Sequence, residues 1–208
     1  MDPKVPIVRY SDGERINHWT VAILFVLVAI SGLSLFHPAL FWLSSLFGGG
    51  PWTRILHPFF GVAVFVSFVA EMSRFWRDNR IEAHDRQWLR QWRDVLANRE
   101  DKLPEVGRYN AGQKVLFWVM VVGMFALLVT GIMFWRPWFA YSFPIGLVRL
   151  ASLLHAAVAA ILIVAIIVHV YAAIWTKGSF RAMIRGTVSL RWAMKHHRAW
   201  TQEKIKQG

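Results

Sequence analysis

The chain has no cysteine among its 208 residues. This absence excludes iron–sulfur clusters bound by the chain itself, haem attached through thioether bonds, and disulfide bridges. A redox cofactor in this protein must therefore be held by histidine or methionine side chains, or non-covalently.

Acidic residues are also scarce: 12 Asp and Glu stand against 24 Lys and Arg, which gives a formal net charge of +12. Such an excess can indicate a nucleic-acid partner. However, 21 of the 24 basic residues lie before residue 16, within 74–114, or after residue 176. This clustering follows the positive-inside rule of membrane proteins and predicts that both termini and the middle loop are cytoplasmic. We expect no nucleic-acid partner.

Long apolar runs, by contrast, are abundant, with 56% hydrophobic residues and a mean hydropathy of +0.38. A helix needs about 20 apolar residues to cross a hydrocarbon layer of about 30 Å. Four segments meet this requirement, at about 16–36, 55–74, 115–135 and 148–175. The sequence predicts an all-α integral membrane protein, a single membrane domain over residues 1–208 that is built as a bundle of four transmembrane helices. No signal-peptide cleavage pattern precedes the first span, so we expect that helix to remain in the mature protein.

The segments between the spans carry weaker signals. Residues 37–52 form the first outer loop, which ends in a glycine-rich break. In the cytoplasmic loop 75–114, spaced tryptophans predict a short interfacial helix near 86–97, with a solvated linker as the alternative. The tail 177–208 alternates basic and apolar residues, which predicts an amphipathic cytoplasmic helix that docks on a partner or on the bilayer surface. A solvated, charge-rich end is its alternative.

Two histidines in the last span are the most informative residues of the chain. His155 and His169 are 14 residues apart in a run without charge from Leu150 to Thr176. At about 100° per residue, this spacing puts both imidazoles on one helix face, about 21 Å apart along the axis. Ionisable residues inside a membrane span are costly and indicate function.

A short motif, Arg-Ile-x-His, occurs at the start of each of the first two spans and ends at His18 and His57. Because these two helices run in opposite directions, their histidines lie near opposite faces of the membrane. The fourth helix enters from the outside, so His155 shares the outer level with His57, and His169 shares the inner level with His18. Low-spin haem iron takes one axial imidazole on each side of the porphyrin, and facing helices supply such pairs. We therefore predict two haem b groups, with His57 and His155 as the outer ligand pair and His18 and His169 as the inner pair.

Other polar residues near the spans have simpler interpretations. Arg15 and Arg54 precede their histidines by three residues and could reach haem propionates, although interfacial snorkelling explains them equally well. Glu71, the only acidic residue in the four spans, is expected to pair with Arg74 at the cytoplasmic edge. Small residues would let a porphyrin or a neighbouring helix approach closely at Gly32, Gly61, Gly123 and Gly131.

The remaining histidines carry no predicted ligand role. His37 lies beyond the end of the first span and stays unassigned, whereas His84, His196 and His197 are expected to be solvated in the cytoplasm. Membrane histidines also serve in zinc or copper transport, but transported metals usually recruit carboxylates or sulfur nearby, and Glu71 is the only acidic residue near a span.

A series of motifs covers nearly the whole chain. In order, they are Arg15-x-x-His18-Trp19, Arg54-Ile-Leu-His57-Pro58-Phe59-Phe60-Gly61, Gly107-x-Tyr-Asn-Ala-Gly-Gln-Lys114, Trp135-Arg-Pro, His155, His169-x-Tyr171 and Lys177-Gly178. Together they resemble the cytochrome b (gamma) subunit of respiratory formate dehydrogenases of the formate dehydrogenase-N/O type.

The resemblance implies the same two haem pairs and adds a menaquinone pocket beside the inner haem, formed by Asn110, Gly112 and Gln113. The two amides suit a quinone carbonyl and the glycine leaves room for a ring, although helix capping by Asn110 would explain them equally well. The resemblance further implies an iron–sulfur (beta) subunit, a molybdenum- or tungsten-dependent catalytic (alpha) subunit and the bacterial inner membrane. It is compatible with a trimer of heterotrimers.

These features predict a subunit that passes electrons from an outer iron–sulfur subunit across the membrane to menaquinone near the cytoplasmic face. Formate itself would be oxidised in another subunit. The cytochrome b subunit of a membrane-bound hydrogenase or thiosulfate reductase shares the architecture and is the nearest alternative. Two alternatives come from other classes: a haem-free membrane anchor, which predicts no haem absorption, and a metal transporter, which predicts metal-dependent flux.

Overall fold

The computed structural model describes residues 6–97, 99, 102–136 and 138–207. It divides into two compact units, which we describe separately. The span unit consists of Ile16–Met72 and Val119–Val168, and the terminal unit consists of Met1–Arg15, Ser73–Trp118 and His169–Gly208. Pro137, which belongs to the Trp135-Arg-Pro motif, lies outside the described residues.

Four long helices account for the predicted spans. They are α1 (Asp12–Phe36), α2 (Gly50–Phe75), α5 (Ala111–Phe134) and α6 (Ile145–Trp175). Each is long and apolar enough to cross a membrane, which confirms the predicted all-α fold with four spanning helices. The helices begin three to five residues before the predicted spans.

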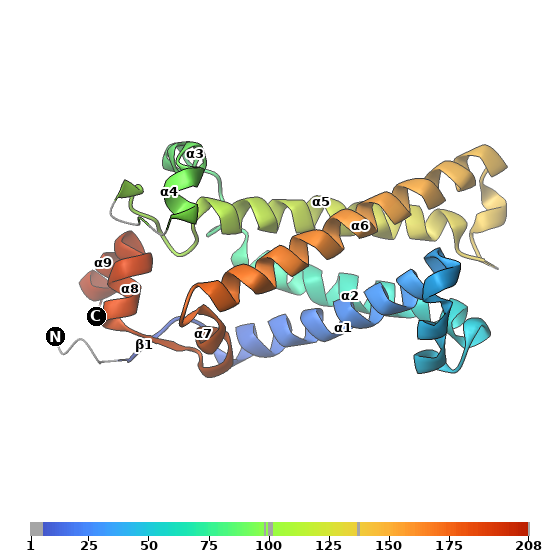
Figure 1. The fold of residues 1–208 in the computed structure, drawn as a ribbon, viewed down its shortest axis with the longest axis horizontal. Helices are drawn as coiled ribbons and strands as arrows, with labels where there is room; N and C mark the ends of the chain where they lie inside the picture. The colour runs from blue at the N-terminus through green and yellow to red at the C-terminus, as the bar shows by residue number, and fades with distance from the viewer. Residues whose placement is uncertain (1–5, 98, 100–101, 137, 208) are drawn as a thin grey trace. The chain divides into compact units, whose positions relative to one another are not determined.

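Neighbouring helices of the span unit meet through aromatic and small residues. In this unit their segments run alongside one another (Figure 1). The Asn17 amide of α1 donates to the Ser67 carbonyl of α2 at 3.1 Å. Phe65 of α2 packs edge-on against Phe125 of α5, with ring centroids 5.0 Å apart.

The helices α5 and α6 pack through a glycine. A Cβ atom at Gly123 would lie 2.6 Å from a methyl carbon of Leu162, so a larger residue would force the buried Leu162 side chain to move. Leu162 is buried, whereas neighbouring side chains of α6 such as Ile161, Val164 and Ile167 are exposed. An apolar surface of this kind suits a hydrocarbon environment.

The predicted first outer loop contains a regular element. A 3₁₀ helix, η1 (Pro38–Phe47), follows α1 and ends at Gly48, whose φ of +86° is left-handed. The His37 side chain caps this helix, because its Nδ1 accepts the Ala39 N–H at 3.2 Å. The unassigned histidine thus has a structural role. A second short 3₁₀ helix, η3 (Ala140–Ser142), precedes α6.

In the terminal unit, the predicted interfacial helix near 86–97 is two shorter helices. These are α3 (Ala83–Arg90) and α4 (Trp92–Leu96), which meet at Gln91. The start of α3 lies earlier than predicted because the Asp85 carboxylate accepts the Glu82 backbone N–H at 2.7 Å and so closes the first turn.

The prediction of one amphipathic helix in the tail is wrong. The tail comprises α7 (Ser179–Arg185), β2 (Thr187–Ser189), α8 (Leu190–His196) and α9 (Arg198–Gln207). The strand β2 pairs antiparallel with β1 (Pro6–Val8), so that Val8 faces Thr187. Gly186 breaks the helix: its φ is +76°, and a Cβ atom there would lie 2.6 Å from the Tyr10 carbonyl oxygen.

The apolar residues of the tail build a small core with the N-terminal strand. The buried side chains are Ala182, Val188, Ala193 and Trp200, and Ile7, Tyr10 and Trp192 pack against them. Of the periodic apolar residues that predicted a surface helix, Val188 is buried in this core and Trp192 packs against it, whereas Phe180 and Ile184 are exposed.

Candidate functional site

Two histidines from different helices face each other in the span unit. His57 lies on α2 and His155 on α6, with their ring centroids 6.3 Å apart and the ring planes inclined at 72°. Phe134 packs edge-on against His155 at 5.1 Å between ring centroids. The structure thus brings together the residues of the predicted outer pair.

A serine on the neighbouring helix fixes the orientation of His57. The Ser31 hydroxyl donates to the Val28 carbonyl at 3.1 Å and lies 2.9 Å from His57 Nδ1. Since its proton is engaged with Val28, the hydroxyl oxygen accepts the Nδ1–H of His57. The next residue, Gly32, leaves room for the ring, because a Cβ atom there would lie 3.0 Å from His57 Cε1.

Thr130 and Gly131 repeat this arrangement at His155. The Thr130 hydroxyl donates to the Ala126 carbonyl at 2.6 Å and lies 2.9 Å from His155 Nδ1. A Cβ atom at Gly131 would lie 3.3 Å from His155 Cε1. In both pairs the hydrogen bond fixes the tautomer with the proton on Nδ1, so Nε2 keeps its lone pair for a ligand.

Sequence reasoning missed both hydroxyl groups. Ser31 precedes His57 by 26 residues and Thr130 precedes His155 by 25. A hydroxyl residue followed by glycine, placed on the preceding span at this distance, is the sequence signal that could have found them. Of the other two glycines singled out, Gly123 packs against Leu162, and Gly61 faces no atom within 4 Å among the described residues.

The expected pairing of Glu71 with Arg74 is replaced by a pairing of Glu71 with His18. The Glu71 carboxylate lies 2.8 Å from His18 Nδ1. The Arg74 guanidinium donates instead to the Gly13 carbonyl at 2.9 Å. A histidine near the end of an apolar helix needs a polar partner for Nδ1, and a carboxylate one turn from the helix end is a strong one. His169 belongs to the terminal unit and His18 to the span unit, so the inner pair stays a prediction.

The two arginines proposed for propionates have different surroundings. Arg15 forms an ion pair with Asp12 at 2.5 Å and also donates to the Ile184 carbonyl. Arg54 lines a cavity of about 530 Å³ together with Ser34 and Phe41.

The residues of the predicted quinone pocket form the first turn of α5. The Asn110 side-chain oxygen accepts the Gln113 N–H at 3.0 Å, and the Gln113 side-chain oxygen accepts the Asn110 N–H at 3.0 Å. This reciprocal capping box shows that Asn110 caps the helix, which was the alternative to quinone binding. Both capping bonds use amide oxygens, and neither side-chain NH₂ group donates a hydrogen bond within the described part of the chain. At Gly112, a Cβ atom would lie 3.3 Å from the Trp88 indole of α3.

Arg9, Arg108 and His197 form a clamp that holds the loop leading into this turn. Arg9 donates to the Arg108 carbonyl at 2.8 Å, and Arg108 donates to the Arg9 carbonyl at 3.1 Å. His197 Nδ1 donates to the Gly107 carbonyl at 3.0 Å, while its Nε2 lies 3.0 Å from an Arg9 nitrogen and accepts from it. The prediction that His197 is solvated is wrong: it is buried, and His84 and His196 are half-buried.

Acidic residues and aromatic rings surround the second arginine of the clamp. Arg108 forms ion pairs with Glu14 at 2.8 Å and with Asp78 at 2.9 Å, and its guanidinium lies 5.2 Å from the centre of the Phe75 ring. Although burial alone would lower the pKa of Arg108, the nearby Tyr109, Glu14 and Asp78 raise it overall. Arg108 therefore stays charged.

Comparisons with known proteins agree with this arrangement. A family model described as prokaryotic cytochrome b561 matches residues 9–186. The chain is a member of the prokaryotic cytochrome b561 family. The nitrate-inducible formate dehydrogenase cytochrome b556(Fdn) subunit of Escherichia coli (strain K12) is 50% identical over 197 residues, which cover 95% of this chain and 91% of the relative. The formate dehydrogenase cytochrome b556(fdo) subunit of the same strain is 45% identical over 200 residues, covering 96% and 94%.

A third relative is the formate dehydrogenase cytochrome b556 subunit of Haemophilus influenzae, 39% identical over 96% of this chain and 84% of its own length. The cytochrome thus belongs with the formate dehydrogenase cytochrome b556 subunits, as the motifs of the sequence indicated. It is an integral membrane b-type cytochrome, and haem binding and electron transport follow from its family.

Because His197 is buried in the clamp, we expect acid to lower the stability of the terminal unit. Burial, together with the Arg9 guanidinium, lowers the pKa of His197 from 6.5 to about 3. The unfolded chain therefore binds a proton that the folded cytochrome excludes, and the stabilisation is present above pH 6.5 and is lost progressively as pH falls from there towards 3. We expect proteolysis of the tail to accelerate between about pH 7 and pH 5.

A matched pair of variants checks this expectation. His197→Gln removes the titrating group and should flatten the pH dependence of tail cleavage, whereas His37→Gln, which changes an exposed histidine of the span unit, should retain it. Equal pH dependence in the wild type and His197→Gln would contradict the prediction.

Proposed function

We propose that this cytochrome is the dihaem subunit of a membrane-bound formate dehydrogenase in the bacterial inner membrane. It passes electrons from an outer iron–sulfur subunit across the membrane to menaquinone near the cytoplasmic face. His57 and His155 hold the outer haem b, and His18 and His169 hold the inner one. Formate is oxidised in a molybdenum- or tungsten-dependent partner subunit.

The distance between His57 and His155 carries this proposal. One iron between two imidazoles, with metal–nitrogen bonds of about 2 Å and each ring centre about 1 Å further out, separates the ring centroids by about 6 Å. The observed separation is 6.3 Å. The two rings therefore have the spacing of an axial ligand pair, and they come from facing helices.

The protonation of both rings fits the same role. Haem iron binds an imidazole nitrogen that carries a lone pair, and the partner on the other nitrogen sets the tautomer. Ser31 and Thr130 accept the Nδ1–H of His57 and His155, so each Nε2 keeps the lone pair that would bind the haem iron. Glu71 lies 2.8 Å from His18 Nδ1 and supplies the corresponding acceptor for the inner ligand. A haem bound there supplies reversible one-electron iron chemistry.

Arg54 suits the propionates better than Arg15. Arg54 lines a cavity in the span unit, whereas Arg15 is engaged by Asp12 and the Ile184 carbonyl. We assign the outer propionates to Arg54. Arg15 would reach a propionate only after giving up these bonds.

The first turn of α5 can bind a quinone while it remains capped. Because the side-chain oxygens of Asn110 and Gln113 accept the capping bonds, their NH₂ groups are oriented as donors for a quinone carbonyl. Gly112 and the Trp88 indole supply a flat apolar surface next to these donors. Capping and quinone binding are therefore compatible at one turn.

Partners follow from the relatives and from the charge distribution. The relatives are named as cytochrome b556 subunits of formate dehydrogenases, so we propose an iron–sulfur (beta) and a catalytic (alpha) subunit for this chain, in a trimer of heterotrimers. The basic terminal segments and middle loop favour a cytoplasmic location for both termini.

A haem count tests the function directly. Purified protein should contain two b haems per chain by pyridine haemochrome, and His155→Ala should contain one, because the outer iron loses a ligand. His37→Ala, a histidine that caps η1, should keep two. The haem-free anchor is the better model if the wild type shows no haem absorption.

The hydroxyl partner of His155 should tune the iron it binds. Thr130→Val keeps the shape but removes the acceptor, which makes the imidazole a weaker donor and favours ferrous iron. We expect the reduction potential of one haem to rise by about 60 mV, a tenfold change for one electron, in a potentiometric titration. Thr130→Ser keeps the hydroxyl and should behave as the wild type. An unchanged potential in the valine variant would exclude this role.

Asn110→Asp separates capping from quinone binding. Aspartate still caps the helix but has no NH₂ donor. We expect unchanged thermal stability and about tenfold weaker binding of a soluble naphthoquinone, the cost of one lost hydrogen bond, measured by titration calorimetry. Asn110→Ala should lose both stability and binding. Wild-type affinity in the aspartate variant would leave Asn110 with capping alone.

A further inference from the structure

A buried ion pair lies beside the turn proposed to bind the quinone. The Lys114 ammonium lies 2.8 Å from the Asp85 carboxylate, and the two side chains are 5% and 2% exposed. Lys114 is on the same face of α5 as Asn110, one helical turn along, and its backbone N–H bonds to the Asn110 carbonyl at 3.0 Å. The proposed function uses neither charge.

A contribution to the stability of the fold does not explain well why this ion pair is buried. Burying two charges costs about as much as their attraction returns, and well-packed apolar residues often replace such pairs without loss. A buried pair of titratable groups next to a reaction site instead indicates a chemical role.

The second carboxylate oxygen of Asp85 lies near the His84 ring. Asp85 Oδ1 is buried and lies 3.6 Å from His84 Nε2, and within the described residues neither atom has a hydrogen-bond partner. A small movement of the His84 ring, or its protonation, would close this gap with a charge-assisted hydrogen bond. The other ring nitrogen, His84 Nδ1, lies 3.3 Å from the Glu82 carboxylate.

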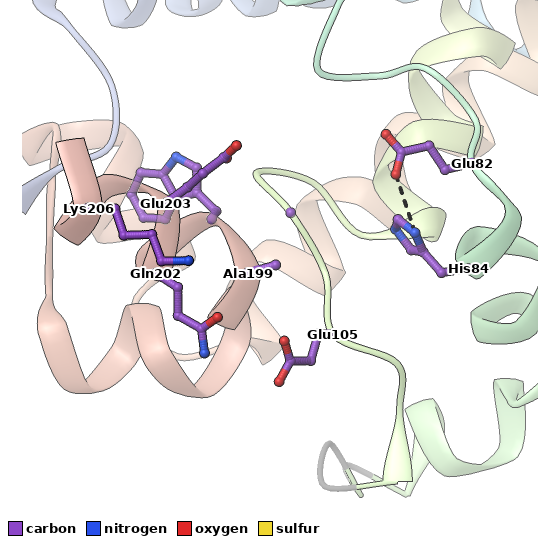
Figure 2. Close-up of a pocket in the computed structure, with 9 residues that line it drawn as sticks. Glu82, His84, Glu105, Ala199, Gln202, Glu203 and Lys206 are labelled. Atoms are coloured by element: carbon purple, nitrogen blue, oxygen red, sulfur yellow. Dashed lines mark ion pairs between the residues drawn. The ribbon is translucent and has the colours of Figure 1, made fainter.

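Glu82 and His84 open onto a cavity of about 490 Å³. Figure 2 shows them on one side, residues of α9 on the other, and Glu105 between them. The cavity wall also includes the Glu203 carboxylate. Carboxylates at the mouth of a path attract and concentrate protons near its first titratable group.

We propose that His84, Asp85 and Lys114 form a proton relay from this cavity to the quinone at the start of α5. The relay rests on the proposed function, which supplies the quinone and its electrons. His84 takes a proton from water in the cavity, Asp85 accepts it from His84 Nε2 at Oδ1, and Lys114 receives it from Asp85.

The relay supplies the protons that reduction of the quinone requires. Reduction of one quinone to the quinol takes two electrons, which arrive through the cytochrome, and two protons. The Lys114 ammonium gives one proton to a quinone oxygen, becomes a neutral amine and is recharged through Asp85. Two passes deliver two protons, and the three side chains return to their starting charges.

The test is the oxidation of the reduced cytochrome by a quinone. The haem-loaded cytochrome is reduced with stoichiometric dithionite and mixed with 2-methyl-1,4-naphthoquinone in a stopped-flow instrument, in H₂O and in D₂O. We expect His84→Gln and Asp85→Asn to slow haem oxidation by about a hundredfold or more, the usual contribution of acid–base catalysis. The solvent isotope effect should increase, and added imidazole should restore the rate of His84→Ala.

Three controls keep the outcome decisive. Asp94 of α4 forms an ion pair with Arg99, and Asp94→Asn makes the same chemical change there and should react as the wild type. Naphthoquinone affinity and haem potentials should not change in the relay variants, whereas a structural defect would move them. If Asp85→Asn does not fold because Lys114 loses its partner, the half-buried His84 decides alone.

Two results would overturn the proposal, and they are distinguishable. Folded His84→Gln that is oxidised at the wild-type rate excludes the relay and leaves the proposed function intact. Wild-type protein without haem, or with haem that the naphthoquinone cannot oxidise, overturns the proposed function and the relay with it.

Discussion

The hydrogen bond between an imidazole Nδ1–H and a side-chain hydroxyl sets the geometry of the span unit. In an apolar environment an unpaired polar group costs several kcal/mol, so a histidine placed there must find a partner on a neighbouring helix. Ser31 serves His57 and Thr130 serves His155, each at 2.9 Å. Each hydroxyl is followed by a glycine against which the ring lies. Two helix pairs, α1 with α2 and α5 with α6, are thereby held by the same device.

Local properties of the chain made much of this fold predictable. Apolar length set the four helices, and the antiparallel order of the spans matched His57 with His155, whose rings the structure brings together. The motif around Asn110 and Gln113 predicted both a cap and a binding turn. The structure confirms the cap, which uses the amide oxygens and leaves the amide nitrogens for the quinone binding that we propose.

Other parts depend on contacts between distant residues, which a single sequence does not reveal. The choice of Glu71 between Arg74 and His18 depends on how α1 and α2 are rotated, and periodicity leaves that rotation open. The tail showed the right apolar residues for a surface helix, but the left-handed Gly186 and the pairing of Val8 with Thr187 turn it into a folded end. The sequence alone therefore predicts a solvated His197, although this side chain is buried in the clamp.

The pairing of β1 with β2 has a consequence for biogenesis. Val8 is among the first residues to leave the ribosome, and its partner Thr187 follows only after α6 has been made. The clamp on Gly107 and Arg108 includes Arg9 and His197, so it cannot close until synthesis has passed both. A chain that stops before residue 187 would contain all four apolar helices yet lack the clamp that holds the loop before Asn110. The four apolar helices would thus exist well before the turn at Asn110 is held in place, and completion of the tail is the step that secures it.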